Sequence, residues 1–368
     1  MVFSKLKRWI CAALASLMMA SPTVSLACTS FLLPGSDGGF VYGRTLEFGM
    51  DIKSRGIAVP RNLAMQGTGI DGTVGSGLKW TTKYAAFGAS ALGLPIMVDG
   101  MNEKGLAGGM LYLPGISEYQ EVSPTESANS IASYEMLVYA LTNFATVNEV
   151  REGFRNIKVN RSPQKDFKGV VPLHLTLHDA SGKSLVIEYI GGELQISDNP
   201  TSILTNAPQF SWHLAGLGNY AGLSTSDPKP MQVGDAKYGP PSSGGGMTGL
   251  PGDFSSPSRF VRAFFMKENA PKNMTTREQV GTAFHFLNNF DIPPGLVSLS
   301  SGFGGSSGGY EITYYAAVSD LKNKVFYIRT HDNPSIQSIE MANLDLDATA
   351  IRFFDLNTKW QVHPLTGQ

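Results

Sequence analysis

The residue in this sequence whose type and position most clearly indicate reactivity is a cysteine that follows a leader-like segment. Basic residues at positions 5, 7 and 8 precede an apolar stretch over 9–20, and small residues Ser25 and Ala27 stand at −3 and −1 relative to Cys28. This is the layout of a secretory signal peptide. The apolar stretch is shorter than the roughly 20 residues that a membrane-spanning helix needs. We therefore expect residues 1–27 to be a signal peptide and residues 28–368 to be a single exported domain, periplasmic or secreted, without a membrane span.

Cleavage after Ala27 would leave Cys28 as the only thiol and as the N-terminal residue, because the other cysteine, Cys11, lies inside the predicted leader. Two chemistries require a cysteine there. Lipoprotein maturation modifies both its thiol and its amine, but favours an aliphatic residue at −3, where this chain has Ser25. Catalysis by an N-terminal nucleophile instead uses the free α-amine, whose ordinary pKa is about 7.7–8.0, as the base for its own side chain. The pattern favours the nucleophile and leaves open the lipoprotein and a cysteine without a role.

A catalytic thiol would need two further groups. A nearby cation favours the thiolate, and a hydrogen-bond donor stabilises the oxyanion that forms when a thiolate attacks a carbonyl group. Arg44, in the apolar-flanked run YGRTLEFG, and Asn206, in ILTNAP, have suitable types and settings. From the residues alone, ordinary structural roles remain open for both.

Other kinds of chemistry find little support. The chain has 29 Lys+Arg and 30 Asp+Glu without basic blocks, which argues against a nucleic-acid partner or binding to anionic lipid. Two cysteines cannot build a disulfide scaffold or a cysteine zinc site. No GxGxxG motif opens a predicted helix, and the complete phosphate-loop pattern GxxxxGK[ST] does not occur in the sequence. His174 and His178 lack further ligands at metal-binding spacing, so we expect neither a metal ion nor an organic cofactor.

The elements that must position these residues alternate between strands and paired helices. The pattern from Cys28 to about Tyr112 is strand-like, with a turn around residues 102–105. Apolar residues at helical spacing predict a helix over 131–144, and the capping box 146–149 predicts a second helix to about 156. Strands over 171–178 and 184–189, joined by Asp179–Gly182, read as a hairpin.

The second half repeats this order. Residues 224–258 are rich in Ser, Gly and Pro and mostly loop. Ser256 followed by Pro257 predicts a helix to about 269, and Thr275 with Glu278 caps another to 290. Strands over 311–320 and 324–330 follow. Antiparallel hairpins that alternate with helix pairs indicate a layered α+β architecture rather than a doubly wound sheet.

Beyond these patterns, the sequence resembles the choloylglycine hydrolases, which comprise conjugated bile acid hydrolases and penicillin V acylases. The resemblance runs from Cys28 to about His331. It rests on the following motifs: Cys28-Thr29, GRTLEFG at 43–49, NEKGLAGG at 102–109, LTNAPQFSWHLAGLGNYAGL at 204–223 and GLPGDFSSPSRF at 249–260. The block at 204–223 is the most specific of them because of its length.

The resemblance implies an N-terminal nucleophile hydrolase fold, an αββα four-layer sandwich with two antiparallel sheets between helical layers. By position, Cys28 matches the nucleophile and Arg44 the arginine near its thiol. Asn206 matches the side-chain donor to the oxyanion, and Arg259 matches a second active-site arginine. Family members are often tetramers, so the resemblance also raises the prospect of a homotetramer.

Two positions depart from the bile salt hydrolase pattern. Glu47 stands where that pattern has an aspartate that orients the α-amine, so the charge is kept and the side chain is one methylene longer. Bile salt hydrolases have an asparagine at the position of Tyr112, whereas penicillin V acylases have a tyrosine there, as this chain does. A backbone N–H near Tyr112 would serve as the second oxyanion donor.

The implied activity is hydrolysis of a linear amide between an apolar acyl group and a small amine, without a cofactor. Penicillin V, N-acyl homoserine lactones and conjugated bile acids are compatible small-molecule substrates, and Tyr112 and the leader favour the first two. The alternative from a different functional class is a lipid-anchored binding protein that is modified on Cys28 and has no catalytic activity. We expect the walls of the acyl pocket to include the following apolar residues: Met50, Phe87, Leu92, Leu111 and Leu113.

Overall fold

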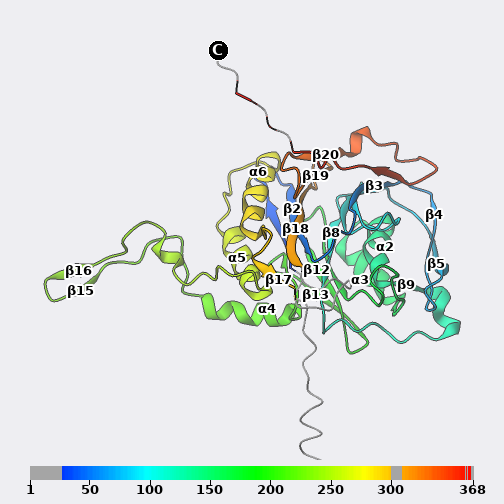
Figure 1. Cartoon of the computed structure of the whole chain (residues 1–368), viewed down its shortest axis with the longest axis horizontal. Coiled ribbons are helices and arrows are strands. Elements are labelled where there is room, and N and C mark those ends of the chain that lie inside the picture. Colours follow the sequence, from blue (N-terminus) through cyan, green and yellow to red (C-terminus); the bar gives the residue numbers. More distant parts are fainter. Residues whose placement is uncertain (1–26, 300–308, 361, 363, 366–368) are drawn as a thin grey trace, which may run out of the picture.

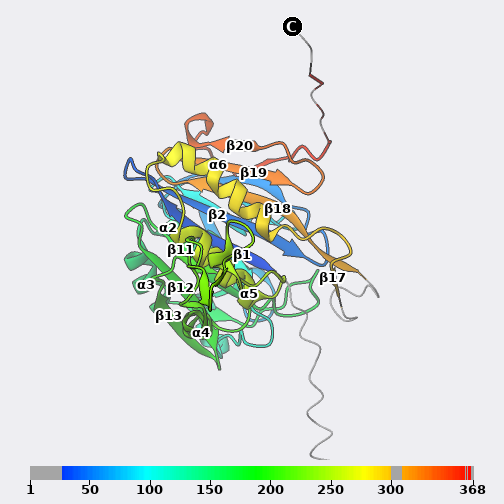
Figure 2. The ribbon, with the colours of Figure 1, turned by 90° about the vertical axis from the view of Figure 1, so that its left-hand side faces the viewer.

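Two antiparallel β-sheets packed face to face, with helices on both outer sides, form the body of the protein (Figure 1; Figure 2). The computed structural model describes residues 27–299, 309–360, 362, 364 and 365. The predicted signal peptide up to residue 26, including Cys11, and the Gly/Ser segment 300–308 lie outside the described residues. In the described part of the chain, every helix is too short or too polar to cross a membrane.

The first sheet contains the N-terminal strand with Cys28. Its strands, in spatial order, are β14 (Ile203–Leu204), β1 (Cys28–Pro34), β2 (Phe40–Phe48), β18 (Tyr310–Asp320), β19 (Val325–Thr330) and β20 (Gln337–Glu340), and β17 (Val297–Ser298) pairs with β18. Antiparallel register places Cys28 opposite Leu46 and Ser30 opposite Arg44. Because β1 lies between β14 and β2, Cys28 begins an internal strand whose neighbours hold it on both sides.

The second sheet faces the first across the core. Its strands, in spatial order, are β13 (Glu193–Asp198), β12 (Ser184–Ile190), β11 (Leu173–His178), β8 (Ala107–Tyr112), β7 (Asp99–Asn102), β6 (Ala86–Ser90), β3 (Arg55–Val59) and β21 (Arg352–Phe354). Gly109 of the NEKGLAGG motif allows close approach of the two sheets. A Cβ atom at Gly109 would overlap the Tyr42 hydroxyl and the Asp99 carboxylate, which meet at this point.

Two pairs of helices complete the four layers. Helices α5 (Ser256–Glu268) and α6 (Thr276–Leu287) cover the first sheet, and α2 (Met136–Asn143) and α3 (Val147–Arg155) cover the second (Figure 1). The predicted capping residues are confirmed for α3, where Thr146 accepts a hydrogen bond from the Glu149 N–H, and for α6, where Thr275 and Glu278 form a capping box. Helix α5 begins one residue earlier than predicted, with Ser255 at the N-cap position, and the Ser255 side chain makes no capping hydrogen bond.

The predicted helix over 131–144 is wrong in its first turn. Residues Ser130–Ala132 form strand β9, which pairs in parallel with β10 (Lys158–Asn160), and a 3-10 turn η2 (Ser133–Glu135) separates it from α2. The buried Glu135 carboxylate accepts hydrogen bonds from the Ala132 and Thr68 backbone N–H groups. These bonds favour the extended backbone over helix, although the apolar spacing suits a helix.

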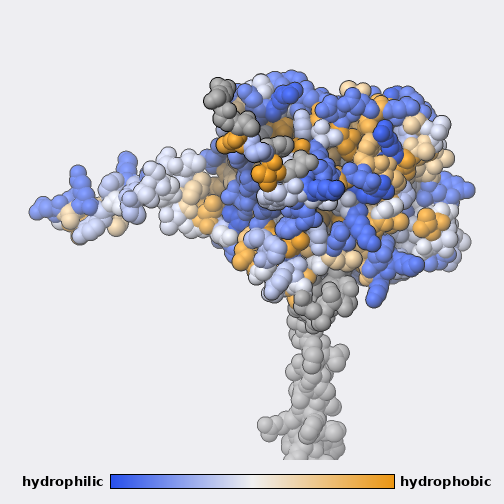
Figure 3. All heavy atoms as spheres, turned by 45° about the horizontal axis from the view of Figure 1, so that its top comes forward, coloured by the Kyte–Doolittle hydropathy of each residue, from blue (hydrophilic) through white to orange (hydrophobic). Residues whose placement is uncertain are grey.

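The Ser/Gly/Pro-rich segment is mostly loop, as predicted, and it leaves the body as a projecting arm (Figure 1; Figure 3). Its tip is a hairpin of β15 (Met231–Val233) and β16 (Ala236–Tyr238), followed by the short helix η4 (Gly245–Met247). The remaining elements are β4 (Ala64–Thr68), β5 (Val74–Thr81), η1 (Pro124–Asn129), α4 (Phe210–Gly216), η3 (Leu217–Tyr220), η5 (Asn288–Phe290) and η6 (Met341–Asn343).

Candidate active site

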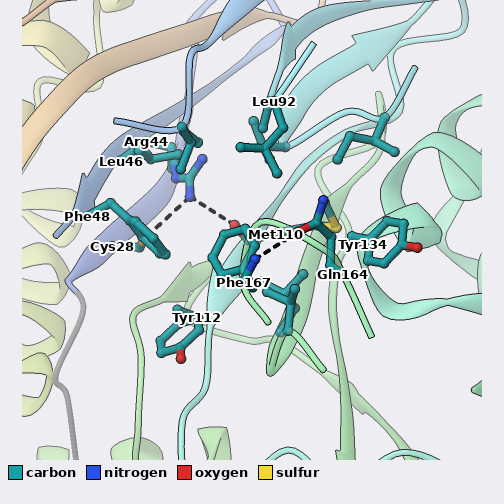
Figure 4. A pocket seen from close by; sticks show the side chains of 16 residues that line it. Cys28, Arg44, Leu46, Phe48, Leu92, Met110, Tyr112, Tyr134, Gln164 and Phe167 are labelled. Carbon is teal, nitrogen blue, oxygen red and sulfur yellow. Dashed lines mark hydrogen bonds between the residues drawn. The ribbon is translucent and has the colours of Figure 1, made fainter. Parts of the chain in front are cut away.

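The Cys28 thiol lies between the two sheets beside a buried arginine (Figure 4). Cys28 is 2% exposed, and its Sγ atom accepts a hydrogen bond of 3.2 Å from Arg44 Nη2. The register of β1 and β2 sets this proximity, because it brings Arg44 opposite Ser30, two residues along the strand from Cys28. Residues two apart on a strand share one face, so both side chains point toward the second sheet.

Arg44 spans the gap between the sheets and is held at several points. Its Nη1 atom pairs with the carboxylate of Asp99 on β7 and donates to the Tyr315 hydroxyl at 3.1 Å, and its Nη2 atom donates to the Met110 carbonyl oxygen at 2.9 Å. Burial acts to lower the pKa of Arg44, but the Asp99 carboxylate together with Cys28, Tyr315 and Tyr42 outweighs burial and raises that pKa. The guanidinium is therefore a fixed positive charge next to the thiol.

Burial and the cation act in opposite directions on the thiol. Burial raises the pKa of the Cys28 thiol above its ordinary value, while the Arg44 charge and hydrogen bond act to lower that pKa. Burial has the larger effect, so the thiol keeps its proton until a base removes it. An α-amine on Cys28 itself would be such a base, within the same residue.

Asn206 and Arg259 surround the backbone of Cys28. Asn206 follows β14, the strand that pairs with β1, and its Oδ1 atom accepts hydrogen bonds from the Cys28 backbone nitrogen at 2.5 Å and from Arg259 Nη2 at 2.8 Å. Asn206 Nδ2 donates to the Tyr112 carbonyl oxygen at 2.7 Å. An amide nitrogen carries two N–H groups, so one remains for a substrate oxygen.

Arg259 reaches the same point from helix α5. Its Nη1 atom donates to the Cys28 carbonyl oxygen at 2.5 Å and to Thr29 Oγ1 at 2.8 Å. Arg259 is fully buried, so its charge acts at short range on the N-terminal residue of β1. The structure therefore brings Cys28, Arg44, Asn206 and Arg259 together, and Tyr112 touches the group through its backbone carbonyl.

Glu47 lies on the other face of the first sheet from Arg44. Its Oε1 atom accepts a hydrogen bond of 3.1 Å from Thr313, and its backbone N–H donates to the Ala27 carbonyl oxygen at 3.1 Å. Burial raises the pKa of Glu47 to about 8. In the structure, the Cys28 backbone nitrogen belongs to the peptide bond with Ala27 and donates to Asn206. The predicted role of Glu47 concerns a free α-amine, so it stays a prediction.

A cavity with largely apolar walls opens beside the thiol (Figure 4). Side chains from both sheets and from the loops at their ends line it: Cys28, Arg44, Leu46, Phe48, Ile52, Ala91, Leu92, Ile96, Val98, Met110, Tyr112, Tyr134, Gln164, Phe167, Val171 and Leu173. Phe48 makes edge-to-face contacts with Tyr112 and Phe167, at centroid distances of 5.9 and 5.6 Å. Gln164 Oε1 accepts from the Phe167 N–H at 3.0 Å, which holds this aromatic wall in place.

Among the five predicted wall residues, only Leu92 lines the cavity. Phe87, Leu111 and Leu113 are completely buried in the core, and Met50 packs against a core cluster outside the lining. Leu111 lies between two lining residues of β8, but side chains alternate along a strand, so its own side chain takes the other face. Alternation also provides the signal that could have identified Phe48, since residues 44, 46 and 48 share one face of β2.

The two histidines of β11 have structural partners. His174 contacts Glu188 at 3.2 Å and the Thr205 carbonyl oxygen at 2.8 Å, and His178 contacts Ser184 Oγ at 2.7 Å. Burial lowers the pKa of His178 to about 3. Within the described ranges, no group of His, Cys, Asp and Glu side chains is arranged to hold a metal ion.

Comparison with known proteins places this geometry in a family. The family model described as linear amide C–N hydrolases, choloylglycine hydrolase family, matches residues 28–354. The chain belongs to the choloylglycine hydrolase family. It is accordingly an amidohydrolase that acts on linear amides, and the resemblance inferred from the sequence motifs is confirmed.

Individual relatives match this chain over nearly its whole length. A bile salt hydrolase/transferase of Clostridium perfringens is 30% identical over 332 residues, which cover 90% of this chain and 97% of that protein. The crystal structure of a mutant conjugated bile acid hydrolase from the same species gives a TM-score of 0.81 at 29% identity and covers 92% of this chain and 100% of its own. The penicillin V acylase of Agrobacterium tumefaciens gives 0.71 at 27% identity, with coverages of 89% and 91%. These likenesses confirm the N-terminal nucleophile hydrolase fold.

Proposed function

We propose that this member of the choloylglycine hydrolase family is an exported N-terminal-cysteine amidohydrolase that cleaves an apolar acyl group from a small amine. One observation carries the proposal: the Cys28 thiol lies 3.2 Å from a buried guanidinium and lines a cavity whose other walls are almost entirely apolar. An apolar acyl chain in that cavity would bring its carbonyl carbon to the thiol. The small amine would then point out of the cavity.

The reaction uses groups already next to Cys28. The α-amine, exposed by removal of residue 27, takes the thiol proton, and the thiolate attacks the amide carbon. The free N–H of Asn206, with a backbone N–H near Tyr112, stabilises the oxyanion, and a donor of this type contributes about 3–4 kcal/mol in subtilisin. The ammonium gives its proton to the leaving amine, and water hydrolyses the thioester by the same route.

For the acyl group, we favour slender or aromatic substrates such as penicillin V and N-acyl homoserine lactones. The contacts of Phe48 with Tyr112 and Phe167 place aromatic rings in the cavity wall, where a phenoxy ring or an alkyl chain can pack against them. The alternative is a conjugated bile acid hydrolase, which the names of several relatives favour. Penicillin V would then be a surrogate for another amide.

The test is a comparison of kcat/KM for penicillin V, a long-chain N-acyl homoserine lactone and glycocholate, with Cys28→Ala as the inactive control. We expect the first two to be hydrolysed faster than glycocholate. A clear preference for glycocholate would overturn the substrate proposal and leave the amidase intact.

Export and a free N-terminus are tested by mass. We expect the protein purified from the periplasm or medium after expression of the full chain to have the intact mass of residues 28–368. A diacylglyceryl adduct on Cys28 would instead identify the lipid-anchored binding protein, because lipidation consumes both the thiol and the amine.

We also propose that the chain assembles into a homotetramer through its arm. The hairpin β15–β16 exposes Met231, Val233 and Tyr238 by 67%, 61% and 59%, so their apolar surface is not covered within the described chain. Light scattering of the purified protein is expected to give the tetramer mass, and Met231→Ser with Val233→Ser to reduce it. A monomer at micromolar concentration would contradict the proposal.

A further inference from the structure

A second buried carboxylate lies beside the N-terminal end of β1. Glu311, on β18, is 1% exposed, and its Oε1 atom accepts a hydrogen bond from the backbone nitrogen of Ala27, the residue just before Cys28. Glu47 is completely buried nearby, and its Oε2 atom has no hydrogen-bond partner in the described structure. Two carboxylates therefore flank the peptide that cleavage would open.

An irregularity in β18 brings Glu311 to this position. The register between β2 and β18 shifts between Thr313, which lies opposite Glu47, and Tyr315, which lies opposite Leu46. On one side of the shift, Thr313 donates to Glu47, and on the other Tyr315 donates to Asp99 in the space between the sheets. A bulge of this kind re-aims side chains, and here it places Thr313 and Tyr315, which are two residues apart, on opposite faces of the first sheet.

Removal of residue 27 changes the partners of Glu311. The Ala27 N–H that it accepts is lost, and the new α-amine of Cys28 lies one residue away, where neighbouring Cα atoms are about 3.8 Å apart. We propose that Glu311 is a positioning residue for this reaction, a second carboxylate that, together with Glu47, orients the Cys28 α-amine and stabilises its ammonium form. The inference rests on the proposed function, because it requires Cys28 to be N-terminal.

The charges around this point support that role. In the uncleaved chain, where the Cys28 nitrogen is a neutral amide, burial raises the pKa of Glu311 to about 7 and that of Glu47 to about 8. Arg259 is the cation that acts on both carboxylates. An ammonium group would add a second cation, so that two positive charges would balance two negative ones in a buried site.

The consequence for the reaction is a shift in a proton equilibrium. The thiol S–H bond breaks and an N–H bond forms on the α-amine, while both carboxylates keep their charge and take no proton. A negative charge within about 4–6 Å favours the charged form of an amine by about one pKa unit or more. Glu311 would thus raise the pKa of the α-amine and favour the ammonium–thiolate pair.

The experiment measures the α-amine directly. The full chain is expressed as wild type, Glu311→Gln and Glu311→Asp, and intact mass verifies that each protein begins at Cys28. The pH dependence of reductive methylation of the α-amine, followed by peptide mass, gives its pKa, and kcat/KM against pH gives the acid limb. Asp179→Asn is the matched control, since Asp179 is a carboxylate of 3% exposure that caps α3 through the Val147 N–H.

We expect Glu311→Gln to lower the α-amine pKa by about one unit or more and to move the acid limb of kcat/KM to lower pH by a similar amount. Glu311→Asp keeps the charge and is expected to recover part of the shift, and the control is expected to leave both values unchanged. An α-amine pKa that is the same in the wild type and in the folded variants overturns the inference; if Glu311→Gln does not fold, Glu311→Asp decides. The labelling needs no substrate, so it tests the role of Glu311 separately from activity. If the wild type is inactive but its α-amine pKa is higher than that of Glu311→Gln, only the amidase proposal is refuted.

Discussion

Two variants that remove the Arg44 cation are expected to separate the effect of Arg44 on the reactivity of the Cys28 thiol from its effect on the stability of the protein. Arg44→Met keeps a long side chain and removes the charge. On its own, this substitution leaves the Asp99 carboxylate buried without its cation. The double variant Arg44→Met with Asp99→Asn removes the whole ion pair. Both variants lack the cation, but only the single variant keeps an unpaired Asp99 carboxylate.

The size of both effects follows from the geometry. Two unit charges separated by the 3.2 Å between Nη2 and Sγ interact by about 5 kcal/mol at an effective dielectric constant of about 20. Asp99 offsets part of that interaction, so we expect the pKa of the Cys28 thiol to rise by about 1–3 units in both variants. Breaking a buried ion pair by removing one partner costs about 3–5 kcal/mol of unfolding free energy, and the double variant should recover most of it.

Two assays measure these quantities. Alkylation of Cys28 by iodoacetamide as a function of pH gives the thiol pKa, because the thiolate is the reactive form. Urea unfolding gives the unfolding free energy. Arg55→Met is the matched control: Arg55 pairs with Asp355 at 2.9 Å on the surface, and exposed pairs contribute about 0–1 kcal/mol. The control is expected to leave thiol reactivity unchanged.

Two results would refute this reasoning. An unchanged alkylation profile in the folded double variant would mean that Arg44 does not set the reactivity of the thiol. Equal losses of stability in the single and double variants would mean that the orphaned Asp99 charge is not the source of the cost. Either outcome would leave the identification of the family untouched.

Three further predictions concern the nucleophile, the cavity and a buried histidine. Cys28→Ala and Cys28→Ser are both expected to lose amidase activity with unchanged far-UV circular dichroism, and activity in the alanine variant would rule out the nucleophile. Phe167→Ala removes one aromatic wall of the cavity, so KM for penicillin V should rise about tenfold, consistent with about 0.5–1.5 kcal/mol per aromatic contact. KM for glycocholate is expected to rise less. Equal changes in KM for both substrates would argue against a selective wall. His178 has a pKa of about 3 in the folded protein against an ordinary value of 6.5, so the folded state binds fewer protons and its stability falls as pH drops below 6.5. At pH 4.5 this loss amounts to roughly 2–3 kcal/mol relative to pH 7. Urea unfolding of His178→Asn should show a smaller loss than the wild type, whereas the same pH slope in both would contradict the assignment.

Several elements of the fold follow from local signals in the sequence. The caps of α3 and α6 depend on side chains three residues from the positions they cap, and the hairpins β11–β12 and β18–β19 depend on their turns. The position of Cys28 after a leader pattern, and the motif blocks around Arg44 and Asn206, also identified the family without any contact being known. In each of these cases, the relevant information lies within a short stretch of chain.

Other features arise only when strands that are distant in the sequence pack together. Ser130–Ala132 is a strand because the Glu135 carboxylate accepts a hydrogen bond from Thr68, more than sixty residues away. Leu111, one of the four predicted wall residues outside the cavity lining, takes the other face of β8 because side chains alternate along a strand. The ion pair of Arg44 with Asp99 crosses from one sheet to the other, and Glu311 meets Ala27 from the opposite end of the chain through a bulge in β18. Such contacts depend on the packing of two sheets at a fixed register, which local propensity does not determine.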